Sequence, residues 1–145
     1  MGNDNKKYIV GKIASIDAPN FTMNVLEFYK HLPHFPCFCP KRVYWITNIK
    51  GEKKSGQHAH SDDENELFVV IQGKTKMILD DGSGKEVIDL NINNTVWVPK
   101  YIWHGFIELS NDCIILALTS TIYDPERKGY VNDEVGFKKL LVSNK

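Results

Sequence analysis

A succession of short segments rich in β-branched and aromatic residues is the feature that most restricts how this chain can fold. Residues that favour turns (Gly, Asn, Asp and Ser) separate these segments. Many short strands at close intervals are typical of antiparallel sandwiches and barrels, so we expect an all-β protein. The segments are residues 43–49, 67–72, 75–79, 86–90, 95–99, 105–109 and 113–119.

The remaining segments predict further local structure. Asp81-Gly82 lies between two strand-like segments and predicts a tight hairpin, because such turns need residues that accept positive φ. Residues 8–16 and 22–28 are expected to contain a first strand pair. Apolar residues near helical spacing predict a short C-terminal helix over residues 132–141. A length of 145 residues fits a single domain, 1–145, with its core barrel at about residues 41–124.

Composition and charge exclude several classes of partner. Eighteen basic and eighteen acidic side chains give a formal net charge of zero, whereas nucleic-acid binders usually carry a basic excess. No apolar run approaches the roughly 20 residues of a membrane span, and the first seven residues are polar, unlike a signal peptide. Cys37, Cys39 and Cys113 are an odd number of cysteines and predict free thiols, so we expect a cytoplasmic protein.

Two closely spaced histidines are the sharpest candidate for chemistry. In the run Gly56-Gln57-His58-Ala59-His60 they are two residues apart, so on a strand both imidazoles point to the same face. Buried imidazoles need hydrogen-bond partners, which makes such a pair costly as mere packing. The pair therefore indicates either a metal site or an acid–base couple.

Downstream residues extend this pattern into one shared with a known superfamily. Glu66 follows the histidine pair, and the segment 99–104 ends in His104. Together these features resemble the two-motif signature of the cupins, except that Tyr101 replaces a glycine and the gap from His60 to Glu66 is one residue longer. The resemblance implies an RmlC-like jelly-roll barrel with its active site in the barrel mouth.

One interpretation of that barrel is a metal centre. His58, His60, Glu66 and His104 would supply three imidazoles and a carboxylate to a divalent ion. These ligands suit iron, manganese, nickel and zinc, and open positions on the ion would accept substrate or O₂.

A second, closer resemblance covers residues 41 to 141. It is to the sugar-nucleotide 3,4-ketoisomerases of the FdtA, QdtA and WxcM-like family, which act on dTDP-4-keto-6-deoxyglucose. The order and spacing of the shared blocks match, with about one residue inserted after His60. The blocks are residues 41–46 (KRVYWI), 56–60 (GQHAH), 78–82 (ILDDG), 103–104 (WH) and 120–124 (STIYD).

This resemblance implies a metal-independent cupin enzyme, usually a homodimer, in which we expect an N-terminal strand to be exchanged between subunits. Its substrate would be a dTDP-linked 4-keto-6-deoxy sugar, made for bacterial surface glycans such as the lipopolysaccharide O-antigen. The chain departs from the family at Ser55, where an arginine is typical, and at Glu66, where glutamine is more usual.

The resemblance also suggests roles for individual residues. Moving the keto group from C4 to C3 through an enediol needs a base with a pKa near neutral, which histidine provides. We expect His60 to be the carbon base and His58 to carry protons or polarise the carbonyl. Arg42 would bind the pyrophosphate and Tyr44 the sugar oxygens. The further expected substrate contacts are Gln57 and His104.

Local charge is compatible with an anionic ligand despite the neutral total. Residues 41–54 hold five basic residues and one acid, directly before the histidine pair. Three alternatives to the ketoisomerase stay open: a metal-dependent cupin dioxygenase or isomerase, a non-catalytic sugar-nucleotide sensor, and a 3,5-epimerase on a related barrel.

Overall fold

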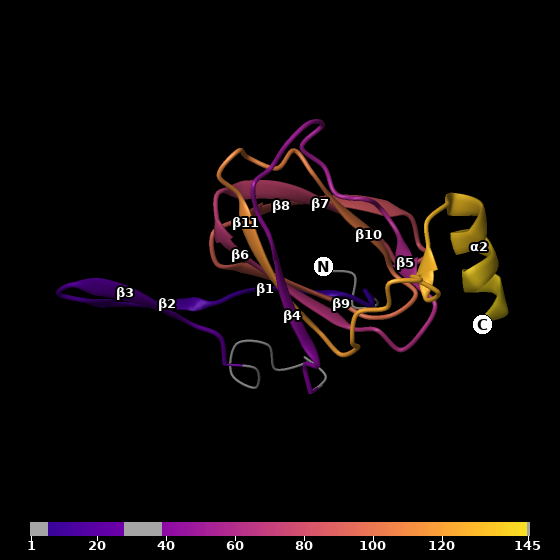
Figure 1. Cartoon of the computed structure of the whole chain (residues 1–145), viewed down its shortest axis with the longest axis horizontal. Helices are drawn as coiled ribbons and strands as arrows, with labels where there is room; N and C mark the ends of the chain where they lie inside the picture. The colour runs from indigo at the N-terminus through magenta and orange to yellow at the C-terminus, as the bar shows by residue number, and fades with distance from the viewer. Residues whose placement is uncertain (1–5, 28–38, 145) are drawn as a thin grey trace.

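The computed structural model describes residues 6–27 and 39–144. Within these ranges the chain is mostly β-structure with a short C-terminal helix, which confirms the predicted all-β class (Figure 1). The elements are β1 (Ile9–Lys12), β2 (Ala14–Ala18), β3 (Phe21–Val25), β4 (Arg42–Ile46), β5 (Ala59–His60), β6 (Glu66–Gln72), β7 (Lys74–Asp80), β8 (Lys85–Asn91), β9 (Asn94–Val98), β10 (Trp103–Ile107), β11 (Ile114–Thr119), β12 (Tyr130–Val131) and α2 (Glu134–Ser143).

Two antiparallel sheets form the barrel. The larger has five strands in the order β1-β9-β6-β11-β4, and the smaller has three in the order β10-β7-β8. Figure 1 shows the two sheets facing each other around a central space, which is the expected cupin arrangement. Apart from β7 and β8, strands that pair in these two sheets are not consecutive in the chain, so residues far apart in the sequence meet inside the barrel.

Apolar side chains from both sheets fill part of that space. Side-chain direction alternates along a strand, and therefore one residue in two points inward. Ile115 and Ala117 of β11, Met77 and Leu79 of β7, and Phe68 of β6 are all buried in one core cluster. This core holds the two sheets at a fixed separation, and the polar site lies beside it.

A small two-stranded sheet and the helix lie at one end of the barrel (Figure 1). β12 pairs with β5, and α2 packs against this end through buried Phe137, whose ring lies 5.6 Å from that of Trp103. The helix begins at Glu134 because Asp133 caps it, accepting a hydrogen bond from the Gly136 amide at 2.7 Å. The helix predicted over residues 132–141 is therefore present, shifted by two residues.

The N-terminal segment differs from the predicted strand pair. The range 8–16 is divided between β1, which joins the barrel by pairing with β9, and β2, which pairs with β3. The division falls at Ile13, whose amide donates to the Asn93 carbonyl at 2.9 Å before the chain leaves the barrel. The β2–β3 hairpin projects away from the barrel (Figure 1). Phe28, at the end of the other predicted strand, lies outside the described residues.

Turns set the other strand boundaries. The predicted Asp81-Gly82 hairpin joins β7 to β8, with Gly82 at φ 97° and its amide donating to Asp80 Oδ1 at 2.8 Å. The strand expected over residues 43–49 ends at Ile46, and Asn48 beyond it has a φ of 57°, which no regular strand adopts.

Two further sequence predictions concern thiols and membranes. Cys39 and Cys113 are free thiols, the first exposed and the second buried, and Cys37 lies outside the described residues. Within the described ranges no helix has the length and apolar character that crossing a membrane requires.

Candidate active site

Four polar side chains from separate elements converge inside the barrel. Glu66 starts β6, His60 ends β5, and His104 lies in β10. His58 is fixed to β10 by a backbone bridge in which it exchanges hydrogen bonds of 3.0 and 2.8 Å with His104. One ligand-type atom of each residue lies within 4.8 Å of the others, so the set predicted from the sequence does come together.

The Glu66 carboxylate is the centre of this cluster. Its Oε2 lies 2.9 Å from His104 Nε2 and 3.2 Å from His60 Nε2, and its Oε1 accepts a hydrogen bond from the Tyr44 hydroxyl at 3.0 Å. Burial alone would raise the pKa of Glu66, but the hydrogen bonds from His104 and His60 outweigh it and hold that pKa below its usual range. Glu66 is therefore a buried, ionised carboxylate.

Tyr44 and His104 are oriented by fixed partners. Burial, followed by the charge of Glu66, raises the pKa of Tyr44 above its usual range, so its hydroxyl keeps the proton that it donates. His104 Nδ1 lies 2.9 Å from the Ile102 carbonyl, which can only accept, so this nitrogen carries a proton. The other ring nitrogen of His104 is thereby directed at Glu66.

The two histidines of the pair have opposite electrostatic environments. Burial, with the nearby His104 and His60, lowers the pKa of His58 to about 3. Burial also acts to lower the pKa of His60, but the hydrogen bond and charge of Glu66, followed by the charge of Glu64, raise it overall. Their Nε2 atoms lie only 3.2 Å apart. Adjacent groups with pKa values pushed apart are a recurring arrangement in acid–base sites.

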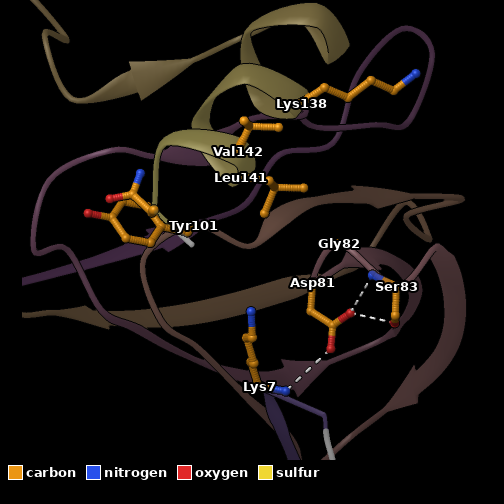
Figure 2. Close-up of a pocket in the computed structure, with 9 residues that line it drawn as sticks. Lys7, Asp81, Gly82, Ser83, Tyr101, Lys138, Leu141 and Val142 are labelled. Carbon is orange, nitrogen blue, oxygen red and sulfur yellow. Dashed lines mark hydrogen bonds between the residues drawn. The ribbon is translucent and has the colours of Figure 1, made fainter.

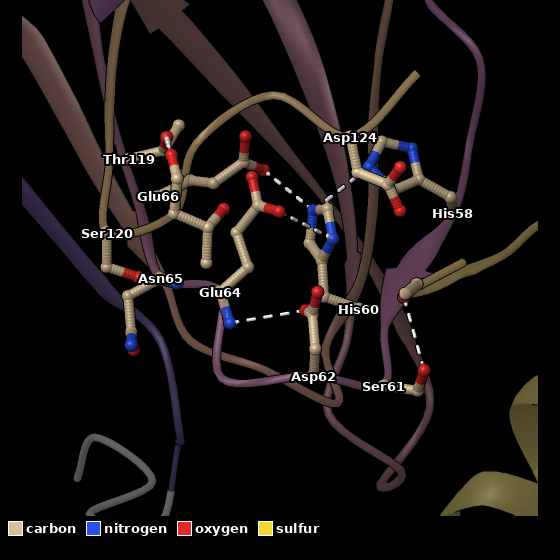
Figure 3. Close-up of polar contacts among 12 residues, drawn as sticks. His58, His60, Ser61, Asp62, Glu64, Asn65, Glu66, Thr119, Ser120 and Asp124 are labelled. Carbon is tan, nitrogen blue, oxygen red and sulfur yellow. Dashed lines mark hydrogen bonds and ion pairs between the residues drawn. The ribbon is translucent and has the colours of Figure 1, made fainter. Parts of the chain in front are cut away.

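A buried ion pair lies behind His60. Glu64 Oε1 accepts a hydrogen bond from Arg42 Nη2 at 2.7 Å, and its Oε2 lies 3.4 Å from His60 Nδ1. Figure 3 shows the carboxylates of Glu64 and Glu66 both directed at the His60 ring. His60 Nδ1 and Glu64 Oε2 are close enough for an ion pair, but they do not have the geometry of a hydrogen bond, and Nδ1 has no other hydrogen-bond partner. Arg42 also donates to Thr119 Oγ1 at 3.1 Å, so its guanidinium is already bound by protein groups.

A cavity of about 570 Å³ opens over this cluster, a size typical of small-molecule sites. Of the predicted residues, Arg42, Tyr44, His58 and His104 line it. His60 is only 1% exposed and lies beneath His58, so it reaches the cavity through its neighbour. The other lining residues are Val43, Ile46, Ser55, Gly56, Phe68, Gly105, Phe106, Tyr123, Arg127 and Tyr130.

Gln57, which the sequence suggests as a substrate contact, is not among the residues that line the cavity. Its side chain accepts a hydrogen bond from Trp103 Nε1 at 3.3 Å and packs so closely over Gly105 that an added Cβ there would come within 2.6 Å of it. Neighbouring residues of an extended chain face opposite sides, so the orientation that turns His58 into the cavity turns Gln57 away.

Tyr130 and Arg127 belong to the cavity but were not predicted from the sequence. The Tyr130 ring stacks on His58 with centroids 4.6 Å apart and an angle of 30°. The Arg127 guanidinium in turn lies over the Tyr130 ring, 4.3 Å from its centroid. Tyr123 falls within a block shared with the ketoisomerases, whereas no motif or periodicity points to residues 127–130.

A separate hollow of about 480 Å³ lies between the β7–β8 turn and α2 (Figure 2). It is lined by Asp81, Tyr101 and Leu141 among others, and by none of the four clustered residues. Tyr101 has a φ of 65°, which is a left-handed conformation. It occupies the turn where the cupin signature has a glycine. Its amide donates to the His60 carbonyl at 2.9 Å, which joins this turn to β5.

Comparison with known proteins identifies the family. Residues 6–142 match the sequence profile of the FdtA family, described as WxcM-like, C-terminal. The chain belongs to this family.

Named relatives of this family member share one type of activity. The chain is 34% identical over 117 residues to a TDP-4-oxo-6-deoxy-alpha-D-glucose-3,4-oxoisomerase from Aneurinibacillus thermoaerophilus. The match covers 80% of this chain and 79% of that protein. Two solved structures from Campylobacter jejuni have the same fold. WlaRA, a TDP-fucose-3,4-ketoisomerase, is 30% identical with a TM-score of 0.77, over 93% of this chain and 96% of its own. WlaRB, a TDP-quinovose 3,4-ketoisomerase, is 26% identical with a TM-score of 0.78, over 92% and 98%.

Replacing the buried carboxylate tests the electrostatic description of the site. Glu66→Gln should lower the pKa of His60, because the ionised, hydrogen-bonded carboxylate is the main group that raises it. The substitution should also reduce the free energy of unfolding by on the order of 3 kcal/mol, as expected for a broken buried ion pair. NMR titration of the histidine side chains and chemical denaturation measure the two effects.

Asp63→Asn is the matched control, since Asp63 is an exposed acid in the loop just before Glu66 and pairs with Lys100 at 2.5 Å. It should leave the His60 titration unchanged. A folded Glu66→Gln variant with the wild-type His60 titration would contradict the description.

Proposed function

We propose that this protein is a sugar-nucleotide isomerase that moves the keto group of a dTDP-4-keto-6-deoxyhexose from C4 to C3. The observation that carries the proposal is the pair His58 and His60, whose pKa values are displaced in opposite directions at the base of the cavity. Membership of the FdtA family and the activities named for its relatives support the substrate class.

The reaction needs only proton transfers. A base removes the proton from C3, the C3–H electrons form a C3=C4 double bond, and the C4 oxygen takes up a proton to give an enediol. The C3 hydroxyl then loses its proton, C4 receives one, and the carbonyl is left on C3. No oxidant or reductant is consumed, so histidines suffice as acid and base.

His58 is the better-placed base. It lines the cavity, whereas His60 is only 1% exposed. A pKa of about 3 keeps the His58 imidazole unprotonated but makes it a weaker base than the near-neutral one that the reaction favours, so position is the argument for His58. His60 lies behind it with a raised pKa and can exchange a proton with it across the 3.2 Å that separates their Nε2 atoms. This division reverses the one expected from the sequence, in which His60 removes the carbon-bound proton and His58 shuttles. His104 also lines the cavity beside His58, but its two ring nitrogens are bound by the Ile102 carbonyl and Glu66, so it would contact the sugar by packing.

Catalysis without metal is part of the proposal, and a metal-dependent cupin is the alternative. The four groups already hydrogen-bond to one another, and both oxygens of Glu66 are engaged by protein donors, which supports the metal-free form. His58, His60, Glu66 and His104 would nevertheless suit a divalent cation in type and spacing. A bound cation would act as a Lewis acid on a substrate oxygen.

We also propose that the protein is a homodimer. The outer face of the five-stranded sheet is almost entirely apolar, and Val43 and Trp45 on it are 53% and 65% exposed. The projecting β2–β3 hairpin carries Phe21, which is 64% exposed. Two apolar surfaces of this kind favour a second copy as partner, with the N-terminal hairpin exchanged between subunits. Cross-strand pairing forms two rows on the sheet, Ile9–Trp97–Leu67–Leu118–Val43 and Thr95–Val69–Leu116–Trp45, in which Leu67, Val69 and Thr95 are already buried within one chain and the exposed part is at Val43 and Trp45.

The wider setting of the proposed activity follows from its product. A 3-keto-6-deoxy sugar nucleotide would serve the synthesis of bacterial surface glycans, including the lipopolysaccharide O-antigen. The free thiols of Cys39 and Cys113 support a reducing compartment, so we place the enzyme in the cytoplasm.

Isotope exchange tests the roles of the two histidines. In D₂O, the wild-type protein should exchange the C3 hydrogen of dTDP-4-keto-6-deoxyglucose and give the 3-keto product, both visible by proton NMR. His58→Asn should lose exchange and turnover together by about 10²–10⁴-fold, the range for losing a general base. His60→Asn should stop product formation yet keep measurable C3 exchange, because the cavity-facing base remains.

The reverse pattern would assign the carbon base to His60. Both variants should still bind dTDP and keep the wild-type circular dichroism spectrum, which serves as the control for folding. If the wild-type product keeps its carbonyl on C4 with an inverted centre, the protein is an epimerase. Tight binding of the sugar nucleotide without any exchange would make it a sensor.

Metal removal tests the metal-independent chemistry. Protein purified without added metal should contain far less than one divalent ion per chain by elemental analysis, and EDTA should leave turnover of dTDP-4-keto-6-deoxyglucose unchanged. Stoichiometric metal together with EDTA-sensitive turnover would replace this proposal with the metal-dependent alternative.

Light scattering tests the dimer. The wild-type protein should have twice the mass of one chain, and Trp45→Arg should shift the equilibrium toward monomer by placing a charge in the apolar face. Val87→Arg is the matched control, since Val87 is 54% exposed on β8 of the other sheet. A monomeric wild-type protein at micromolar concentration would contradict the proposal.

A further inference from the structure

The cavity holds two guanidinium groups, and they differ in what they already bind. Arg42 is largely buried and is held by the Glu64 carboxylate at 2.7 Å and by Thr119. Arg127 is exposed, and within the described residues its guanidinium lies over the Tyr130 ring. Because Glu64 and Thr119 already bind the Arg42 guanidinium, few of its hydrogen-bond donors remain for a ligand. The donors of Arg127 remain available.

The loop that carries Arg127 is firmly built. The Asp124 carboxylate accepts the amides of Glu126 and Lys128 at 2.9 and 3.0 Å, and the Arg127 amide donates to the Asp124 carbonyl at 3.1 Å. The Gly129 carbonyl accepts the Ser61 amide at 2.8 Å. These bonds tie the loop to the strand of His60, so the backbone of Arg127 is held beside the cavity.

The position of Arg127 relative to His58 has the geometry of the proposed substrate. The Tyr130 ring contacts both groups: the Arg127 guanidinium lies 4.3 Å from its centroid, and the centroid of the His58 imidazole lies 4.6 Å from it. In a hexopyranose the diphosphate is attached at C1, across the ring from C4. A sugar whose C3 and C4 lie at His58 therefore directs its diphosphate away from the imidazoles, toward the exposed rim where Arg127 lies.

We propose that Arg127 binds the diphosphate of the sugar nucleotide, a role that the sequence suggests for Arg42. The planar guanidinium pairs with phosphate oxygens in a two-bond fork, and stacking on Tyr130 orients it for this contact. Arg42 instead acts inside the protein, where it neutralises Glu64 behind His60. The inference rests on the proposed function for the identity of the ligand.

Calorimetric titration with dTDP and with thymidine separates this role from others. Arg127→Gln should weaken dTDP binding by roughly tenfold or more, the loss expected for a charge-assisted hydrogen bond. Thymidine, which has no phosphate, should bind both proteins equally. Arg127→Lys should recover part of the dTDP affinity, because it restores the charge without the fork. In turnover assays Arg127→Gln should raise KM and leave kcat within about twofold, as expected when uniform binding is lost.

Lys128→Ala is the matched control. Lys128 is the adjacent cation, exposed and paired with Glu126 at 2.5 Å, and it does not line the cavity. It should leave dTDP binding unchanged. Equal dTDP affinity in wild type and Arg127→Gln would overturn the inference, as would an equal loss of dTDP and thymidine binding. Wild-type protein that binds dTDP through Arg127 yet forms no 3-keto product would refute the proposed reaction and leave the diphosphate contact standing.

Discussion

The buried carboxylate of Glu66 is the interaction on which the site depends. It receives contacts from three different elements: Tyr44 of β4, His60 of β5 and His104 of β10. A lone ionised carboxylate at this depth would be very costly, so these contacts are a condition of burying it. Because the strands come from both barrel sheets and from the small end sheet, satisfying one charge also fixes how those sheets meet.

A second charge pair extends this control to the proton chemistry. Glu64, neutralised by Arg42, faces the ring nitrogen of His60 that Glu66 does not contact. The protein thus surrounds His60 with anions and leaves His58 among histidines and an aromatic ring. Two chemically identical side chains, two residues apart, acquire different protonation preferences from their surroundings alone.

Much of the fold could be predicted because strands leave a local signature. The period of two that places His58 and His60 on one face is realised, and the same period places Gln57 on the other, a consequence that was available from the sequence. Arg127 and Tyr130 were not predictable in this way. They reach the cavity through a turn and a two-residue strand, which are too short to show periodicity. The pairing of Arg42 with Glu64 likewise joins β4 to a loop, and only the folded barrel brings them together.

The left-handed turn at Tyr101 shows how a motif can persist in shape after its residue is lost. Glycine normally makes such a turn at no steric cost, whereas a bulky side chain in this conformation carries strain on the order of 1–2 kcal/mol. Here the bond from its amide to the His60 carbonyl and the strands on either side keep the backbone in place. A search for the glycine by identity would pass over this position, while a search by backbone conformation would find the cupin turn intact.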